Sequence, residues 1–134
     1  MYKIMALDIG TKRIGIALSD YLLVLANGHS YISRNPENEA VSKIIEIAKE
    51  NNVKQIVVGI PYNMDGTEGT QAKDCKNFAS LLSEYDIIFA DERLTSETAE
   101  ENLKSRKINF RNDKGLVDIE SARIILDQYL KERK

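Results

Sequence analysis

Three acidic residues far apart in the chain each stand where a regular element is expected to begin or end. Asp8 follows an apolar run at 4–7, Glu92 follows an apolar run that ends at 90, and Asp118 lies near the start of the last helical pattern. An unpaired buried carboxylate is costly, so such a site must supply a cation, a donor or a proton. Neighbouring carboxylates raise one another's pKa unless a divalent ion binds them, and hard oxygen ligands suit Mg²⁺ or Mn²⁺. The pattern indicates a divalent-cation site.

Apolar periodicity predicts the strands that carry the first acid. Runs at 4–7 and 14–18 predict two neighbouring strands joined by a turn at Gly10, and 24–32 predicts a third antiparallel strand or an edge hairpin. Side chains alternate along a strand, and both faces of the first strand are apolar. Asp8 therefore ends a central strand that is covered on both sides.

A βαβ element is expected next. Asn35 is expected to cap a helix with Pro36 in its first turn, and a continuous apolar run at 55–60 predicts a strand buried on both faces. Thr70 is expected to cap the following helix, and 86–90 is expected to form a short buried strand. The carboxyl end of that strand leads directly to Glu92.

Two further helices are expected to position the remaining acids. Thr95 or Ser96 is expected to cap the first of them. The second runs over 116–130, and its predicted buried face is Ala122, Ile125, Leu126, Tyr129 and Leu130. Asp118 lies one turn before Ala122 on the same face, so a third carboxylate points inward at the positive end of a helix dipole.

Two segments are longer than simple connections require. The loop 59–70 leaves the carboxyl end of a predicted strand, where open α/β sheets place their ligands. The segment 104–114 carries five basic residues and one acid, with Ile108 and Phe110 isolated between them. We expect it to be a mobile basic loop that orders when nucleic acid lies across the acidic site.

Length and composition limit the class of protein. A chain of 134 residues is expected to form a single domain, 1–134, and its net charge of −2 favours neither a nucleic-acid nor a membrane partner by itself. No apolar run reaches membrane-spanning length, and the short start before the first strand leaves no room for a leader. One cysteine, Cys75, cannot pair within the chain and favours a reducing, cytoplasmic location. The lone His29 is interpreted as a surface residue.

Each acid taken singly has an ordinary explanation. Asp8 could simply end a strand, Glu92 could pair with Arg93 on the surface, and Asp118 could be a first-turn helix acid. Their convergence on one sheet edge is what favours a shared cation site.

Four sequence blocks resemble one known family across nearly the whole chain. The blocks are LDIGTKRIGIALSD at 7–20, VVGIPYNMDGTEGTQA at 57–72, DERLTSETAE at 91–100 and DKGLVDIESARIILDQYL at 113–130. They resemble the YqgF/RuvX family of Holliday junction resolvases and pre-rRNA nucleases. The resemblance implies an RNase H-like α/β fold with a mixed five-stranded sheet flanked by helices. Ala6 and the pair Glu120–Ser121 depart from the family pattern without touching the acids.

The resemblance also implies roles for individual residues. Asp8, Glu92 and Asp118 correspond to the metal-binding catalytic carboxylates, which implies two Mg²⁺ or Mn²⁺ ions and hydrolysis of phosphodiester bonds. Basic residues and loop groups near the acids are candidates for binding the nucleic acid. They are Lys12, Arg13, Asn63, Gly66, Arg93, Arg106, Lys107 and Arg111.

Four functions stay open at this point. The resemblance favours a metal-dependent nuclease that processes the 5′ end of pre-16S rRNA in ribosome biogenesis. A Holliday junction resolvase acting in DNA recombination and repair is the main alternative, and the oligomeric state is open because resolution needs two active sites. The first block also resembles the phosphate-binding segment of actin-like and sugar-kinase ATP-binding enzymes, although their two-domain cleft needs a longer chain. A non-catalytic RNA-binding factor that keeps the fold is the fourth.

Overall fold

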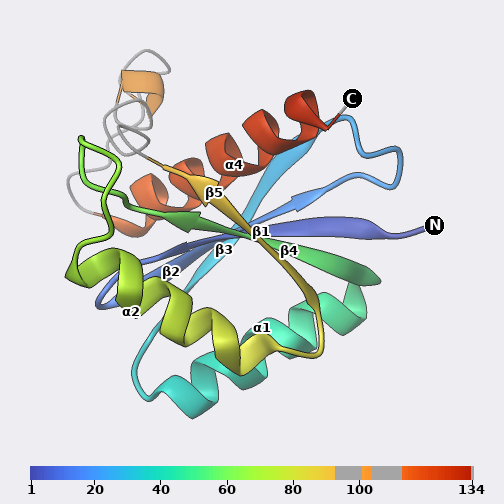
Figure 1. The fold of residues 1–134 in the computed structure, drawn as a ribbon. Coiled ribbons are helices and arrows are strands. Elements are labelled where there is room, and N and C mark those ends of the chain that lie inside the picture. Colours follow the sequence, from blue (N-terminus) through green and yellow to red (C-terminus); the bar gives the residue numbers. More distant parts are fainter. Residues whose placement is uncertain (93–100, 104–112, 134) are drawn as a thin grey trace.

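The computed structural model describes residues 1–92, 101–103 and 113–133. A five-stranded sheet has the order β3-β2-β1-β4-β5 (Figure 1). The strands are β1 (Lys3–Ile9), β2 (Arg13–Ser19), β3 (Ala26–Ser33), β4 (Val53–Ile60) and β5 (Asp86–Asp91). The pairs β1–β2 and β2–β3 are antiparallel, whereas β1–β4 and β4–β5 are parallel. The predicted mixed five-stranded sheet is confirmed.

Helices cover both faces of this sheet. Helices α1 (Glu37–Glu50) and α2 (Thr70–Ala79), with the short η1 (Ser80–Leu82), lie on one face, and α4 (Gly115–Glu132) lies on the other (Figure 1). The alternating direction of side chains along β1 explains why there is a hydrophobic core on each face of the sheet. Met5 and Leu7 pack in the cluster that includes α1 and α2, and Ile4 and Ala6 pack in the cluster that includes α4. Asp8 therefore faces α4, the helix that carries Asp118.

Helix α4 has the buried face that its sequence predicts. Ala122, Ile125, Leu126 and Leu130 are buried against the sheet. Tyr129 is only half-buried, because its hydroxyl donates to Gln55 Oε1 at 2.9 Å. No helix in the described ranges is long and apolar enough to cross a membrane.

The predicted helix caps were wrong. Pro36, not Asn35, holds the N-cap position of α1, and Gly69, not Thr70, holds that of α2. Neither helix has a side-chain capping bond. The capping preference is a weak local signal, and the chain enters both helices in an extended conformation one residue away from the expected cap.

Strand β5 is not the fully buried strand that its apolar residues predicted. It lies at an edge of the sheet, and Phe89 is 46% exposed. An edge strand has a neighbour on one side only, so alternation and apolar content overestimate its burial. The predicted helix capped by Thr95 or Ser96 begins outside the described residues, and the basic segment reaches them only at its last two positions.

Candidate active site

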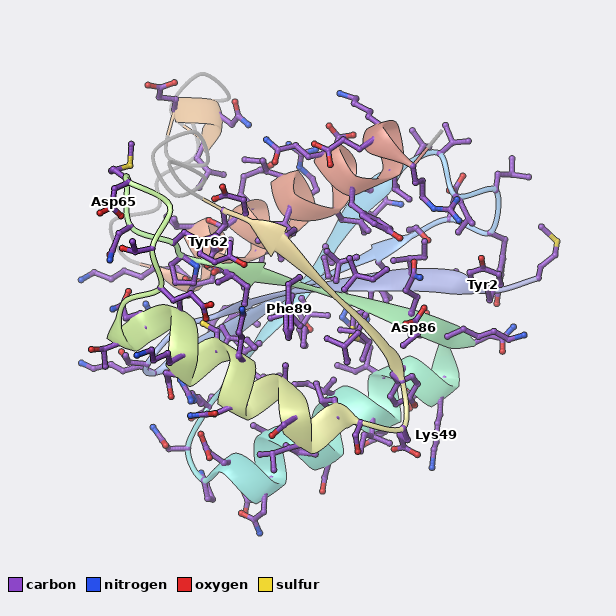
Figure 2. The ribbon with its side chains drawn as sticks, in the orientation of Figure 1. Tyr2, Lys49, Tyr62, Asp65, Asp86 and Phe89 are labelled. Atoms are coloured by element: carbon purple, nitrogen blue, oxygen red, sulfur yellow. The ribbon has the colours of Figure 1, made fainter. Side chains whose placement is uncertain are left out.

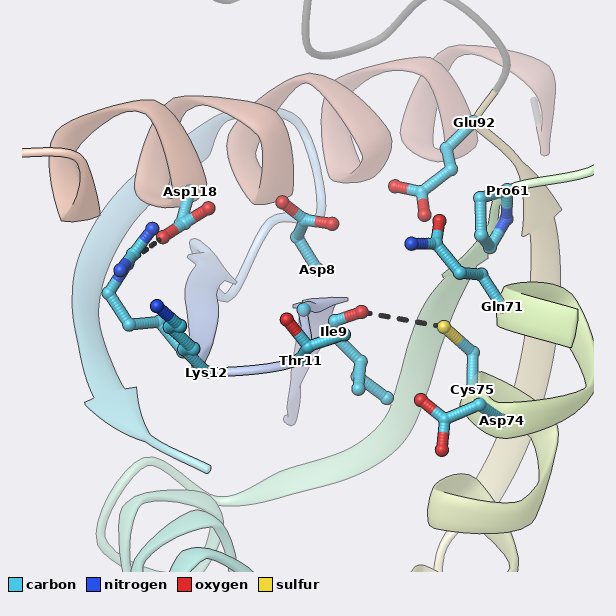
Figure 3. Close-up of a pocket in the computed structure, with 12 residues that line it drawn as sticks. Asp8, Ile9, Thr11, Lys12, Pro61, Gln71, Asp74, Cys75, Glu92 and Asp118 are labelled. Atoms are coloured by element: carbon cyan, nitrogen blue, oxygen red, sulfur yellow. Dashed lines mark hydrogen bonds and ion pairs between the residues drawn. The ribbon is translucent and has the colours of Figure 1, made fainter. Parts of the chain in front are cut away.

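A cavity of about 310 Å³ opens at the carboxyl ends of β1, β4 and β5, beside the first turn of α4 (Figure 3). All three predicted acids line it. The lining residues are Asp8, Ile9, Gly10, Thr11, Lys12, Arg13, Pro61, Gln71, Asp74, Cys75, Glu92 and Asp118. Convergence of the parallel strands at one edge brings Asp8 and Glu92 together, and the inward face of α4 adds Asp118.

Asp8 and Glu92 form a hydrogen-bonded pair of carboxyl groups. Burial, together with the negative charge and hydrogen bond of Asp8, raises the pKa of Glu92 to about 9. Burial also raises the pKa of Asp8 to about 6, against the lowering effect of its hydrogen bond with Glu92. Near neutral pH the Glu92 carboxyl therefore holds a proton and donates it to the Asp8 carboxylate.

The side chain of Glu92 sits in space left by a glycine. A Cβ on Gly59 of β4 would lie 2.7 Å from Glu92 Oε2 and 2.5 Å from Ile125 Cδ1. Only the missing side chain lets a carboxyl group and α4 approach the strand this closely. Gly59 thus helps set where the Glu92 carboxyl lies.

A second glycine brings Asp118 to the site. A Cβ on Gly15 of β2 would overlap the main-chain oxygen of Asp118, so α4 rests directly on this strand. Gly15 is the register partner of Asp8. The start of α4 is therefore fixed over the end of β1, with Asp8 between Asp118 and Glu92 (Figure 3).

Asp118 is paired with a base as well as facing the other acids. Arg13 Nε donates to Asp118 Oδ2 at 2.7 Å, with the two side chains 33% and 20% exposed. The charge of Asp118 also contributes to raising the pKa of Asp8. Arg13, a predicted nucleic-acid contact, is thus the ion-pair partner of Asp118 in the structure.

The donor set fits a hard divalent cation in part. Asp8 and Glu92 offer oxygen ligands, and a cation would replace the proton that they share. Among the described residues, however, no three histidine, cysteine or carboxylate side chains are arranged to hold a metal ion. The ion pair with Arg13 uses only Oδ2 of Asp118, so Asp118 could join the pair through its other oxygen or by releasing Arg13, and either is a change of side-chain partner rather than of fold.

Arg34 connects three parts of the fold around the cavity, and its sequence position did not predict this role. This buried side chain donates to the Gly10 carbonyl oxygen at 3.0 Å and to both carboxylate oxygens of Asp74 at 2.7 and 2.8 Å. It also bonds Glu37 and lies 5.3 Å from the centre of the Phe78 ring. Its hydrogen bonds hold the pKa of Asp74 below the ordinary value. Arg34 ties the turn after Asp8 to α1 and α2, through partners up to 40 residues away that no local pattern reveals.

The loop after β4 is organised by its own contacts. The Asn63 main chain accepts from Gly66 at 2.8 Å, and its side chain donates to Thr67 Oγ1 at 2.9 Å. Gly66 has a φ of 88°, a conformation that favours glycine. Neither Asn63 nor Gly66 lines the cavity, whereas Pro61 and Gln71 at the two ends of the loop do.

The other predicted contacts divide into two groups. Lys12 is exposed and lines the cavity. Four more predicted nucleic-acid contacts lie outside the described residues: Arg93, Arg106, Lys107 and Arg111. Cys75 forms no disulfide, as expected; it is also buried, and burial raises the pKa of its thiol to about 12. A thiol held protonated in this way is a poor nucleophile.

Comparison with known sequences gives one consistent result. The model of the RuvX family, described as Holliday junction resolvase, matches residues 2–132. A protein of Crocosphaera subtropica is 45% identical over 133 residues, which cover 97% of this chain and 93% of that protein. One of Gloeothece citriformis is 42% identical, covering 97% of this chain and 88% of that protein. Both are named "Putative pre-16S rRNA nuclease".

Solved structures agree on the fold. The fowlpox virus resolvase in complex with Holliday junction DNA has a TM-score of 0.61 at 12% identity, covering 98% of each chain. T. thermophilus RuvC in complex with a Holliday junction substrate has a TM-score of 0.61 at 11% identity, covering 99% of this chain and 96% of that one. The predicted RNase H-like fold is confirmed.

Proposed function

The chain belongs to the RuvX family, and on that premise we propose that it is a metal-dependent nuclease that hydrolyses phosphodiester bonds, working as a single domain. The observation that carries this proposal is the convergence of Asp8, Glu92 and Asp118 in one cavity. A pair of carboxyl groups whose pKa values burial raises is characteristic of functional sites.

Each acid has a distinct part in the proposed chemistry. Asp8 and Glu92 would hold Mg²⁺ or Mn²⁺, with Asp118 completing the ligand set after it leaves Arg13. Two divalent ions at such a site would activate a water molecule and stabilise the leaving oxygen. Arg13, once released, would offer a planar guanidinium to a phosphate oxygen, and Lys12 would add an exposed positive charge at the same edge.

We propose the 5′ end of pre-16S rRNA as the substrate, in ribosome biogenesis in the cytoplasm. The names of relatives that share more than 40% of the sequence support this choice. A single active site is sufficient for trimming an RNA end, so the proposal requires no second copy of the chain.

Junction resolution is the second candidate. The description of the matching family and the titles of the two structural neighbours favour it. Unlike RNA trimming, junction resolution requires two active sites, because two strands of the junction are cut in a coordinated way. Dimerisation on a four-way junction is therefore the observation that would favour it over RNA processing.

A side-by-side cleavage assay tests both candidates. End-labelled single-stranded RNA that carries the 16S leader and a four-way DNA junction are incubated with Mg²⁺, Mn²⁺ or EDTA. We expect cleavage of the RNA that needs the metal and is lost in Asp8→Asn. Glu46→Gln is the matched control, because it removes an exposed carboxylate on α1 outside the cavity. Cleavage that persists in EDTA would contradict the metal-dependent mechanism, and absence of cleavage of either substrate would contradict the nuclease proposal.

A further inference from the structure

An aromatic surface is formed by Tyr62, Lys76, Tyr85 and Phe89 over α2 and β5. Figure 2 labels Tyr62 and Phe89. Phe89 is its most exposed ring, at 46%. Tyr62, after β4, and Tyr85, before β5, are half-buried against the core. Exposed aromatic rings that gather in one patch, unlike single exposed residues, often mark a binding surface.

Lys76 of α2 joins the rings of this surface. Its Nζ lies 5.1 Å from the centre of the Phe89 ring and 5.7 Å from that of Tyr62. Glu68 accepts from the same Nζ at 3.0 Å. Glu68 thus balances the positive charge of Lys76. The exposed area of the rings is then the part of this surface that is available to a ligand. A hollow of about 280 Å³, lined in part by Lys76, Tyr85 and Phe89, adjoins it between α2 and β5.

Two residues of the aromatic surface are chain neighbours of residues that line the acidic cavity. Tyr62 directly follows Pro61, and Lys76 directly follows Cys75, and both of those neighbours line the cavity. Phe89 stands three residues before Glu92 on the same strand and its continuation. Tyr62 and Phe89 are therefore the rings of this surface that lie nearest along the chain to the cavity residues Pro61 and Glu92.

We propose that the aromatic surface stacks the unpaired bases of a single-stranded nucleic acid whose backbone enters the acidic cavity. This inference rests on the proposed nuclease function and adds the strandedness of its substrate. Exposed aromatic rings are a recurring platform for single strands, because every base has a face that can stack. Paired bases are already stacked within their helix and are unavailable to such a platform.

The test compares binding of three probes to the Asp8→Asn variant, which prevents cleavage. The probes are a fluorescein-labelled single-stranded RNA, an abasic strand of the same length and backbone, and the RNA annealed to its complement. We expect Phe89→Ala to weaken binding of the single-stranded RNA at least about fivefold, and to leave binding of the abasic strand and of the duplex unchanged. Phe89→Tyr keeps a ring and should retain the affinity, whereas Phe89→Leu keeps only the apolar volume and should lose it.

Two controls separate stacking from other effects. Leu81→Ala removes a side chain that is 51% exposed on η1, outside the aromatic surface, and should not change binding. The salt dependence of binding should be the same in Phe89→Ala as in its parent, because stacking releases no counterions. Thermal melts of each variant confirm that the fold is intact.

The outcomes distinguish this inference from the proposed function. If the wild-type protein cleaves nucleic acid but Phe89→Ala binds the single strand as tightly as its parent, the stacking surface is wrong and the nuclease is not. An equal loss of affinity for the abasic strand would also overturn it, since no base is there to stack. If the wild-type protein neither binds nor cleaves nucleic acid, both proposals fail together.

Discussion

The acidic cavity has two halves that hold their carboxylates in opposite ways. On one side, Asp8 and Glu92 share a proton and a hydrogen bond, and burial raises the pKa of each. On the other side, Asp118 is neutralised by Arg13 at 2.7 Å, at the more exposed start of α4. In the first half a proton reduces the negative charge of the carboxyl groups, whereas in the second half the Arg13 guanidinium balances it. A divalent ion would therefore compete with a proton at one half and with a guanidinium at the other.

Substituting the acids one at a time tests whether the halves act together, and this is the largest effect we expect. Asp8→Asn, Glu92→Gln and Asp118→Asn should each reduce metal-dependent cleavage by more than about a hundredfold, because each removes a negatively charged oxygen ligand. The measurement is single-turnover cleavage with Mg²⁺ and Mn²⁺. If Asp118→Asn kept the wild-type rate, the Arg13 half would be structural and the metal would belong to Asp8 and Glu92 alone.

The pH dependence of the melting temperature should come from Asp8 and Glu92, which form the first half of the cavity. Asp8 and Glu92 have pKa values raised from 3.8 and 4.5 to about 6 and about 9, so the folded protein binds more protons than the unfolded chain between these values. Their contribution to stability is complete below about pH 4 and is lost as the pH rises through about 6 and then about 9. Without metal, the melting temperature should therefore fall between pH 5 and pH 9.

Two changes should flatten that profile. Glu92→Gln has no proton to lose and should be more stable than wild type at pH 8, by on the order of 1 to 3 kcal/mol. Saturating Mg²⁺ should raise the wild-type melting temperature most at high pH, because it replaces the proton. Melting curves recorded in EDTA and in Mg²⁺ measure both. A wild-type profile that rises from pH 5 to pH 9 would show that the two carboxyl groups do not share a buried proton.

Filling the space under Glu92 should disturb the first half alone. Gly59→Ala places a Cβ against Glu92 Oε2 and Ile125 Cδ1, and should cost about 1 to 3 kcal/mol of unfolding free energy. Combining it with Ile125→Val removes the Cδ1 contact and leaves only the contact with the carboxyl oxygen. We expect the double variant to recover stability but not cleavage. Recovery of both would mean that Gly59 matters for packing and not for the position of Glu92.

The sequence was a better guide to the positions of the three acids than to the partners that they bind. Strand alternation puts Asp8 on the α4 face, and helical spacing puts Asp118 on the face of Ala122, because both periods are local properties of the chain. The parallel strands then bring Glu92 to Asp8. The ion pair of Arg13 with Asp118 joins positions 105 residues apart, and it depends on how closely α4 approaches Gly15. Sequence periodicity is local and cannot predict how closely α4 approaches β2.

The same limit explains what was missed elsewhere in the fold. The partners of Arg34 lie on α1, on α2 and in the turn after β1, so its role exists only once those elements are packed. The exposure of Phe89 depends on β5 being the last strand of the sheet, which its own apolar residues do not encode. The basic segment and the contacts predicted for Arg106, Lys107 and Arg111 remain predictions. Nothing in the described residues bears on those three.

Removing Arg13 should have the smallest effect on stability and is the sharpest test of the second half. Because the ion pair is 33% and 20% exposed, Arg13→Ala should change the unfolding free energy by less than about 1 kcal/mol. Freed of its guanidinium, Asp118 should be available to a divalent ion, so the affinity for Mn²⁺ measured by electron paramagnetic resonance should rise a few-fold without nucleic acid. Arg13→Lys keeps the positive charge and is the matched control, expected to bind Mn²⁺ as the wild type does. Cleavage should still fall in Arg13→Ala, because a phosphate oxygen then lacks its guanidinium partner. Weaker binding of Mn²⁺ in Arg13→Ala would instead show that Arg13 orients Asp118 toward the metal rather than competing with it.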